Sequence, residues 1–194
     1  MNMESMLRRL SQCGNIANVN YVIVGGIAVI IYGRPRFTQD IDVIIEYDRE
    51  KLKQFLALLG KHDFKILNFV EQRLLEEKRR VDILDERSVL RLELLPATEQ
   101  LAFLTLDNIR LQQYKGLELP VTSPEMLLLG KLIYLGDISN VNRESLLQYT
   151  DVRDFCSIYR QQKEKMDLEW LKEKVEVFNV SPRWRTLVNL CHSL

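Results

Sequence analysis

The chain has 194 residues, of which 46% are hydrophobic and 28% charged, so it is long enough to bury a core and too apolar for a disordered or low-complexity scaffold. Its 27 Lys and Arg residues equal its 27 Asp and Glu residues, which excludes the strong positive charge of a general nucleic-acid coat. Any nucleic acid would have to be bound at a local basic patch.

The first 122 residues predict an alternation of helices and strands. Helices are expected where apolar residues recur at helical spacing or follow a capping residue, and strands where β-branched and other apolar residues cluster. In chain order the expected elements are a helix over 3–13, a strand over 21–24, a helix over 27–32, a strand over 40–45, a helix from Asp48 to about residue 59, a strand over 64–67, a helix over 69–77, strands over 81–84 and 89–95, and a hairpin over 109–114 and 117–121.

The pattern becomes helical from Ser123 onward. Ser123 and Pro124 supply a capping residue and a proline at the first helical position, and further helices are expected over 142–162, 167–178 and 181–192. The sequence therefore predicts an α/β (α+β) protein in two parts. These are an α/β core over residues 1–122 and a helical region over residues 123–194 that packs on it.

The sequence predicts neither a membrane span nor a secretory signal. The longest apolar stretch, Tyr21 to Tyr32, is interrupted by glycines and is shorter than the roughly 20 residues of a membrane helix. Cys13, Cys156 and Cys191 form no closely spaced pair, which predicts free, mostly buried thiols rather than a disulfide framework or a zinc site. We therefore expect a cytoplasmic protein without a membrane partner.

Carboxylates are the strongest candidates for chemistry, because two histidines without neighbouring ligands and no Gly-x-Ser-x-Gly sequence argue against a histidine metal site or a serine hydrolase. Asp40 and Asp42 begin the predicted strand over 40–45. Alternate strand residues share a face, so both carboxylates point the same way while Ile41 and Val43 enter the core. A divalent cation such as Mg²⁺ would relieve their repulsion, and a solvated strand edge is the alternative.

Gly25 and Gly26 lie between the predicted strand over 21–24 and the helix that follows. Glycine there lets the backbone turn tightly and approach a ligand, and the N-terminus of the next helix attracts phosphate oxygens. Taken alone, the pair is too short for a Walker loop and fits a plain tight turn. Together with Asp40 and Asp42, it predicts phosphate-binding amides, metal-binding carboxylates and the guanidinium groups of the intervening loop at one edge of the sheet.

The segment YVIVGGIAVIIYGRPRFTQDIDVII resembles the nucleotidyltransferases of the DNA-polymerase-β-like superfamily, and among them the AbiEii-like and minimal group of toxin–antitoxin and abortive-infection systems. The shared pattern is a hydrophobic strand, Gly-Gly or Gly-Ser, a short helix and then Arg-x-Thr-x-Asp-x-Asp. The resemblance covers about residues 18–155. It implies a mixed sheet flanked by helices, with nucleotide contacts from Gly25, Gly26, Arg36 and Thr38.

The resemblance also implies a third acidic residue on a later strand, for which Asp82 and Glu93 compete. The family's acid lies in the second of two strands, just before a Leu-Leu-Pro sequence, and that position is Glu93 here, where Asp is usual. We therefore expect Asp40, Asp42 and Glu93 to be the catalytic, metal-binding residues. The alternative for Glu93 is a surface residue paired with Arg91 on the same face.

A second stretch, VTSPEMLLLGKL, is similar to the family's segment after the sheet and implies that Lys131 reaches the triphosphate. The alternative for Lys131 is a solvated helix lysine.

The resemblance implies an enzyme that uses Mg²⁺ or Mn²⁺ to move a nucleoside monophosphate from a nucleoside triphosphate (NTP) to a hydroxyl group on a protein or an RNA. It also implies a place in a toxin–antitoxin or abortive-infection system, with a cognate toxin or antitoxin as partner. Because Glu replaces the usual Asp at position 93, the alternative is a catalytically weakened protein of the same fold that binds nucleotide or neutralises a partner. A third interpretation is an interaction protein whose Asp-x-Asp sequence is incidental.

Overall fold

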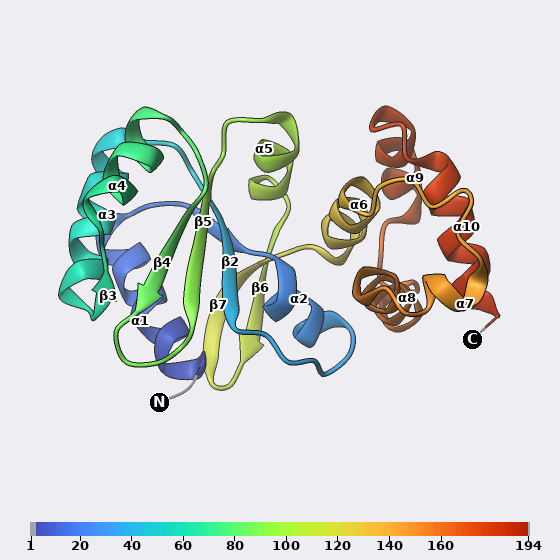
Figure 1. The fold of residues 1–194 in the computed structure, drawn as a ribbon, viewed down its shortest axis with the longest axis horizontal. Coiled ribbons are helices and arrows are strands. Elements are labelled where there is room, and N and C mark those ends of the chain that lie inside the picture. The colour runs from blue at the N-terminus through green and yellow to red at the C-terminus, as the bar shows by residue number, and fades with distance from the viewer. Residues whose placement is uncertain (1–2, 194) are drawn as a thin grey trace. The chain divides into compact units, whose positions relative to one another are not determined.

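The computed structural model describes residues 3–193, which contain a seven-stranded mixed sheet in the order β3-β4-β5-β2-β1-β7-β6 (Figure 1). This architecture confirms the predicted fold class, a mixed sheet flanked by helices. The elements in chain order are α1 (Met3–Ala17), β1 (Tyr21–Ile23), α2 (Gly25–Tyr32), β2 (Asp40–Ile45), α3 (Arg49–Lys61), β3 (Phe64–Lys65), α4 (Asn68–Glu71), the π-helical turn η1 (Gln72–Glu76), β4 (Val81–Asp85), β5 (Arg91–Pro96), α5 (Gln100–Leu106), β6 (Ile109–Tyr114), β7 (Leu117–Thr122), α6 (Pro124–Tyr134), α7 (Arg143–Leu146), α8 (Thr150–Gln162), α9 (Leu168–Val177) and α10 (Ser181–His192).

The chain divides into two compact units, which we call the sheet unit and the helical unit. The sheet unit comprises the described residues up to Ala28 together with Phe37–Thr122. The helical unit comprises Val29–Arg36 together with the described residues from Ser123 onward. Helix α2 therefore contributes its first residues to the sheet unit and its later residues, with the loop behind them, to the helical unit.

Three neighbouring strands position the acidic residues of the sheet unit. Strand β2 runs antiparallel to β1 and parallel to β5, and β5 runs antiparallel to β4. In this register Asp42 pairs with Glu93, and Glu93 pairs with Asp82. Paired residues on adjacent strands point to the same face, so the register brings all three side chains to one row of the sheet.

Different helices cover the two faces of the sheet. The ring of Tyr21 lies against Gly14 of α1, on the face that Ile41 and Val43 also enter. On the opposite face, Val22 and Ile44 pack against Ala97 and against Ala102 of α5. Ile44 follows Asp40 and Asp42 at two-residue spacing, so the acidic residues share the face that α5 covers further along the strand.

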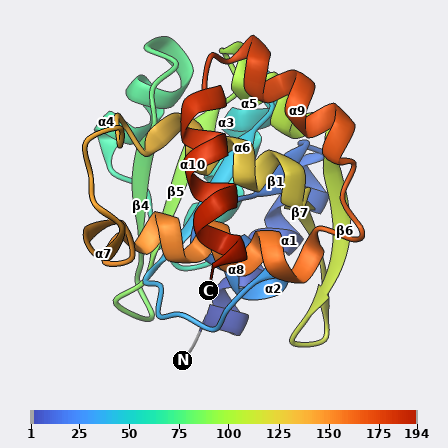
Figure 2. The same ribbon diagram turned by 90° about the vertical axis from the view of Figure 1, so that its right-hand side faces the viewer.

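The helical unit is a bundle in which α6, α8, α9 and α10 pack together (Figure 2). Its centre contains three aromatic rings, with Phe155 stacked on Tyr159 and with Trp184 edge-on to both, at 6.0 and 5.8 Å between ring centroids. Ser123 caps α6, because its hydroxyl oxygen accepts the backbone N–H of Met126 at 3.2 Å. This cap was expected from the sequence.

The expectation of free thiols is wrong for two of the three cysteines. Cys156 of α8 and Cys191 of α10 form a disulfide, with their Cα atoms 5.0 Å apart. They are 35 residues apart in the sequence, and only the packing of α8 on α10 brings them together. Cys13 is free and buried, and burial raises the pKa of its thiol to about 11. Within residues 3–193, no helix is long and apolar enough to cross a membrane.

Candidate functional site

Strand β2 places Asp40 and Asp42 on one face, as predicted. Ile41 is fully buried and Val43 is nearly so, while both aspartates remain half-buried. The alternation arises because successive strand side chains point to opposite faces. Both carboxylates are therefore fixed by a strand whose other face anchors it in the core.

Glu93 of β5 and Asp82 of β4 lie in the same row as Asp42. Burial raises the pKa of the Glu93 carboxyl, and the negative charges of Asp42, Asp82 and Asp40 raise it further, while Arg80 opposes the rise. The two candidates for a third acid thus share one face, and Glu93 lies between Asp42 and Asp82. We call Asp40, Asp42, Asp82 and Glu93 the acidic row.

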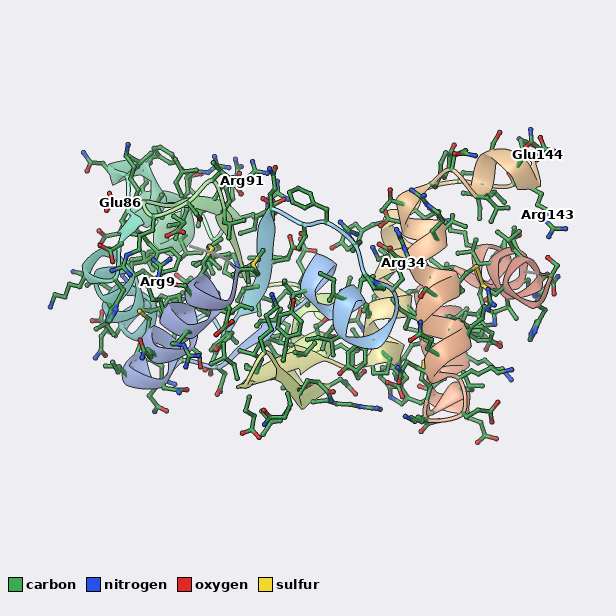
Figure 3. All side chains as sticks on the ribbon, turned by 90° about the horizontal axis from the view of Figure 1, so that it is seen from below. Arg9, Arg34, Glu86, Arg91, Arg143 and Glu144 are labelled. Carbon is green, nitrogen blue, oxygen red and sulfur yellow. A yellow bond between two sulfur atoms is a disulfide. The ribbon has the colours of Figure 1, made fainter. Side chains whose placement is uncertain are left out.

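Two arginines contact the acidic row. Nε and Nη2 of Arg91 each lie 2.8 Å from Oδ1 of Asp40 (Figure 3). Nη1 of Arg80 lies 3.2 Å from Oε2 of Glu93. The ion pair between Glu93 and Arg91 that the sequence left open is therefore not the one formed, because Arg91 stands directly opposite Asp40 in the register of β2 and β5.

Gly25 and Gly26 bring the start of α2 against Asp42. Helix α2 begins at Gly25 itself, two residues earlier than the sequence predicts, because the carboxylate of Asp42 accepts the backbone N–H of Gly26 at 3.2 Å. Gly25 has a φ of +58°, and a Cβ there would overlap Oδ2 of Asp42. Glycine is thus required where the strand turns into the helix.

Thr38 completes the polar surroundings of these glycines within the sheet unit. A Cβ on Gly26 would lie 2.6 Å from Oγ1 of Thr38, and that hydroxyl donates to the backbone carbonyl of Asp40 at 3.2 Å. The structure thus places five of the residues named from the sequence close together. Gly25 lies against Asp42, Gly26 lies against Thr38, and Thr38 is hydrogen-bonded to Asp40.

Arg36 and Lys131, the other two nucleotide-binding candidates, meet in the helical unit on Asp154 of α8. Nη1 of Arg36 lies 2.7 Å and Nζ of Lys131 lies 3.1 Å from Oδ2 of Asp154, which is fully buried. Arg34 adds contacts from Nε and Nη2 to Oδ1, at 3.0 and 2.9 Å (Figure 3). Lys131 also contacts Asp151 at 2.5 Å. No local sequence pattern assigns this role to Asp154, because its partners lie 118 to 120 and 23 residues away in the chain.

The donor types of the acidic row fit a divalent cation, since carboxylate oxygens are the hard ligands that Mg²⁺ and Mn²⁺ take. The register fits too, because Asp42 and Glu93 are neighbours across two strands. Within the described residues, however, no group of three such side chains is arranged to hold a metal ion. Arg91, Arg80 and the Gly26 amide each engage one of these carboxylates, so the carboxylates are turned toward their own partners rather than toward a common centre.

Comparison with known proteins gives a family and a fold. The model of the family described as "Nucleotidyltransferase of unknown function (DUF6036)" matches residues 2–189. No curated protein matches the chain. Among solved structures, an antigenic nucleotidyltransferase-like protein from Paracoccidioides brasiliensis has a TM-score of 0.60 and 18% identity, covering 96% of this chain and 92% of that one.

Two antibiotic-modifying enzymes have a similar fold. The structure of ANT(2″)-Ia in complex with adenylyl-2″-tobramycin has a TM-score of 0.58 and 16% identity, covering 95% of this chain and 99% of that chain. The lincosamide antibiotic adenylyltransferase LnuA, solved with lincomycin bound, has a TM-score of 0.52 and 17% identity, covering 81% and 98%. At these identities the likeness establishes the fold.

Proposed function

Because the chain belongs to the DUF6036 family of nucleotidyltransferases, we propose that it moves a nucleoside monophosphate from an NTP to a hydroxyl group of an acceptor. The observation that carries this proposal is the face of the sheet unit on which Asp40, Asp42 and Glu93 lie beside Gly25 and Gly26. The acids supply ligands for a cation, and the glycines let phosphate oxygens approach the backbone at the start of α2.

In the proposed reaction the acceptor oxygen attacks the α-phosphorus of the NTP and gives its proton to water. The bond between the α-phosphorus and the oxygen that bridges to the β-phosphate breaks, and pyrophosphate leaves. When bound by Asp40, Asp42 and Glu93, two Mg²⁺ or Mn²⁺ ions would lower the pKa of the hydroxyl and offset the charge on the leaving pyrophosphate. Asp40 and Asp42 would hold both ions, and Glu93 would help to hold the one that activates the acceptor hydroxyl.

The remaining predicted residues bind the nucleotide. Gly25, Gly26 and Thr38 lie against the carboxylate of Asp42 or the backbone of Asp40, which supports a role at the phosphates. For Arg36 and Lys131 the role of phosphate ligand stays a prediction. Their shared contact with Asp154 supports this role, because the cluster holds three cations, Arg34 among them, against the two carboxylates of Asp151 and Asp154 and so keeps one positive charge in excess.

We propose a protein or an RNA as the acceptor, with a toxin–antitoxin or abortive-infection system as the setting and a cognate toxin or antitoxin as the partner. The zero net charge of the chain favours a protein acceptor slightly. The names of two structural neighbours, an adenylyl-tobramycin complex and a lincosamide adenylyltransferase, add a small hydroxylated molecule as an acceptor class to include in the test.

A second candidate function is nucleotide binding without transfer. The ion pairs of Arg91 with Asp40 and of Arg80 with Glu93 favour it, because they occupy two of the proposed metal ligands. The longer side chain of Glu at position 93, where the resembling family has Asp, points the same way.

Radiolabelled transfer would test the proposal. The full chain is incubated with each α-³²P-labelled NTP, with Mg²⁺ or Mn²⁺, and with total tRNA, cell lysate, tobramycin or lincomycin as acceptor. We expect label in one acceptor class, lost in the double variant Asp40→Asn/Asp42→Asn and kept in the exposed control Asp107→Asn. The double variant should keep its melting temperature, since replacing neighbouring carboxylates removes repulsion.

The two candidate functions separate in the same samples. Nucleotide that raises the melting temperature with increasing concentration, but is never transferred, would support the binding protein. With neither transfer nor stabilisation, the proposed function would be wrong.

A further inference from the structure

The backbone register of the sheet places Arg91 next to Asp40 of the acidic row. Arg91 and Asp40 are paired residues of the parallel strands β5 and β2, and they point to the same face. Two nitrogens of the Arg91 guanidinium therefore reach one oxygen of Asp40, each at 2.8 Å. The register of β2 and β5 therefore places the two side chains next to each other, within reach of this contact.

Arg80 contacts a second member of the acidic row, Glu93. It directly precedes β4, which pairs with β5, and its Nη1 lies 3.2 Å from Oε2 of Glu93. The side chain of Arg80 is 62% exposed and that of Arg91 is 43% exposed, while Glu93 is 19% exposed. Both arginine side chains are thus more exposed to solvent than the carboxylate of Glu93, which is held in the sheet.

The charges of this cluster are not balanced. The acidic row contributes four negative charges when ionised, and Arg80 and Arg91 contribute two positive charges. Two negative charges are left, which equals the charge of one divalent cation.

We propose that Arg91, aided by Arg80, sets the affinity of this site for divalent cations by competing with them for the carboxylates. A cation that takes Oδ1 of Asp40 as a ligand has to displace the Arg91 guanidinium from the same oxygen. Exchange is feasible because half-exposed ion pairs contribute little stability and the displaced guanidinium returns to water. This inference rests on the proposed function, since it takes Asp40, Asp42 and Glu93 as cation ligands.

Mn²⁺ binding to the full chain, without nucleotide, tests this competition. The free Mn²⁺ signal in electron paramagnetic resonance gives the Kd of the wild type, Arg91→Gln, Arg80→Gln and the control Arg87→Gln. Arg87 is the matched control because it pairs with Asp63, outside the acidic row, so that Arg87→Gln makes the same change of charge. We expect Arg91→Gln to lower the Kd at least about threefold, Arg80→Gln to lower it less, and Arg87→Gln to leave it unchanged.

Arg91→Lys separates the guanidinium contact from bulk charge. Lys keeps the positive charge but offers one nitrogen instead of the two that bind Asp40, so its Kd should lie between those of the wild type and Arg91→Gln. Circular dichroism melts establish that each variant is folded at the temperature of the titration. A Kd for Arg91→Gln equal to or weaker than that of Arg87→Gln would overturn the inference.

The variant Asp40→Asn/Asp42→Asn distinguishes failure of this inference from failure of the proposed function. If the wild type binds Mn²⁺ no better than this double variant, and Arg91→Gln does not bind it either, then both the proposed cation site and the proposed competition are wrong. If the wild type binds, the double variant does not, and Arg91→Gln matches Arg87→Gln, the cation site stands and the competition alone is refuted.

Discussion

At the scale of single residues, Gly25 illustrates how one missing side chain shapes the candidate site. Its backbone is left-handed, with a φ of +58°, and its Cα faces the carboxylate of Asp42 so closely that a Cβ would overlap Oδ2. A substitution therefore meets two penalties, one in the backbone and one in the contact. The Asp42 carboxylate cannot yield cheaply, because it also accepts the Gly26 amide.

We predict that Gly25→Ala lowers the free energy of unfolding by more than about 1 kcal/mol. Gly130→Ala is the matched control, because Gly130 lies inside α6 with no atom within 4 Å of a Cβ, and Ala there should stabilise by up to about 1 kcal/mol. Urea denaturation followed by circular dichroism measures both. Equal midpoints for Gly25→Ala and the wild type would show that Asp42 moves aside without cost.

At the scale of elements, one arginine joins three parts of the sheet unit. Arg9 of α1 donates to the backbone carbonyl of His62, at the end of α3, and to the carboxylate of Asp85, at the end of β4, both at 2.7 Å (Figure 3). Arg9 and Asp85 are both buried. Burial alone would raise the pKa of Asp85, but the hydrogen bonds from Ser88 and Arg9 outweigh it and lower the pKa below its ordinary value of 3.8.

Stability should therefore depend on pH through Asp85. A lowered pKa in the folded state stabilises the fold above about pH 3.8 and loses that effect as the pH falls through the folded pKa. We predict that Asp85→Asn lowers the free energy of unfolding by about 3 kcal/mol at pH 7. Below about pH 4 the difference in this free energy between the variant and the wild type should become smaller. Glu4→Gln, which breaks the exposed Arg8–Glu4 pair of the same helix, should cost far less. A difference in the free energy of unfolding between the wild type and Asp85→Asn that stays constant from pH 7 to pH 3 would contradict this account.

In the helical unit, Asp154 is the corresponding link. It is fully buried and binds Arg34, Arg36 and Lys131, so it ties the loop after α2 to α6 and α8. We predict that Asp154→Asn costs about 3–5 kcal/mol, because cations remain around a neutral group. Asp151→Asn, at a half-exposed partner of Lys131, should cost under about 1 kcal/mol in the same denaturation experiment. Similar losses for both variants would refute the special role of Asp154.

Local signals account for the elements that the sequence predicted well. Strand β2 has the predicted bounds, residues 40–45, and α3 begins after Asp48, whose carboxylate accepts the amides of Glu50 and Lys51. The sequence did not predict α5. Its N-cap residue, Glu99, makes no capping hydrogen bond, and the packing of Ala102 against the sheet replaces that local signal.

The candidate site was predictable as far as its residues lie close in the sequence. Asp40 and Asp42 on one face follow from strand alternation alone. By contrast, the pairing of Asp40 with Arg91 depends on the register of two strands 51 residues apart in the chain. The contact of Arg36 with Asp154 spans 118 residues. No local pattern contains such pairings, because they form only when distant segments pack.

At the scale of the whole molecule, the disulfide makes the stability of the chain depend on its redox environment. In the chain-entropy model, closing a 35-residue loop between Cys156 and Cys191 stabilises by about 3–4 kcal/mol. We predict a lower denaturation midpoint in the presence of a reductant such as dithiothreitol. Thiol titration of the denatured chain should find one reactive cysteine, Cys13, before reduction and three after it. Three reactive thiols in a sample prepared without reductant would show that the bond does not form.

The division of the chain into units also has a consequence for its synthesis. Val29–Arg36 belong to the helical unit, whose other residues begin at Ser123. On a ribosome that adds about 5–20 residues per second, Arg36 is made roughly 6–24 seconds before Asp154, 118 residues later. During that interval Arg34 and Arg36 have been made but Asp154, which they contact in the folded protein, has not. A chain that ends before α8 would therefore lack Asp154, the buried carboxylate that Arg34 and Arg36 bind in the folded protein.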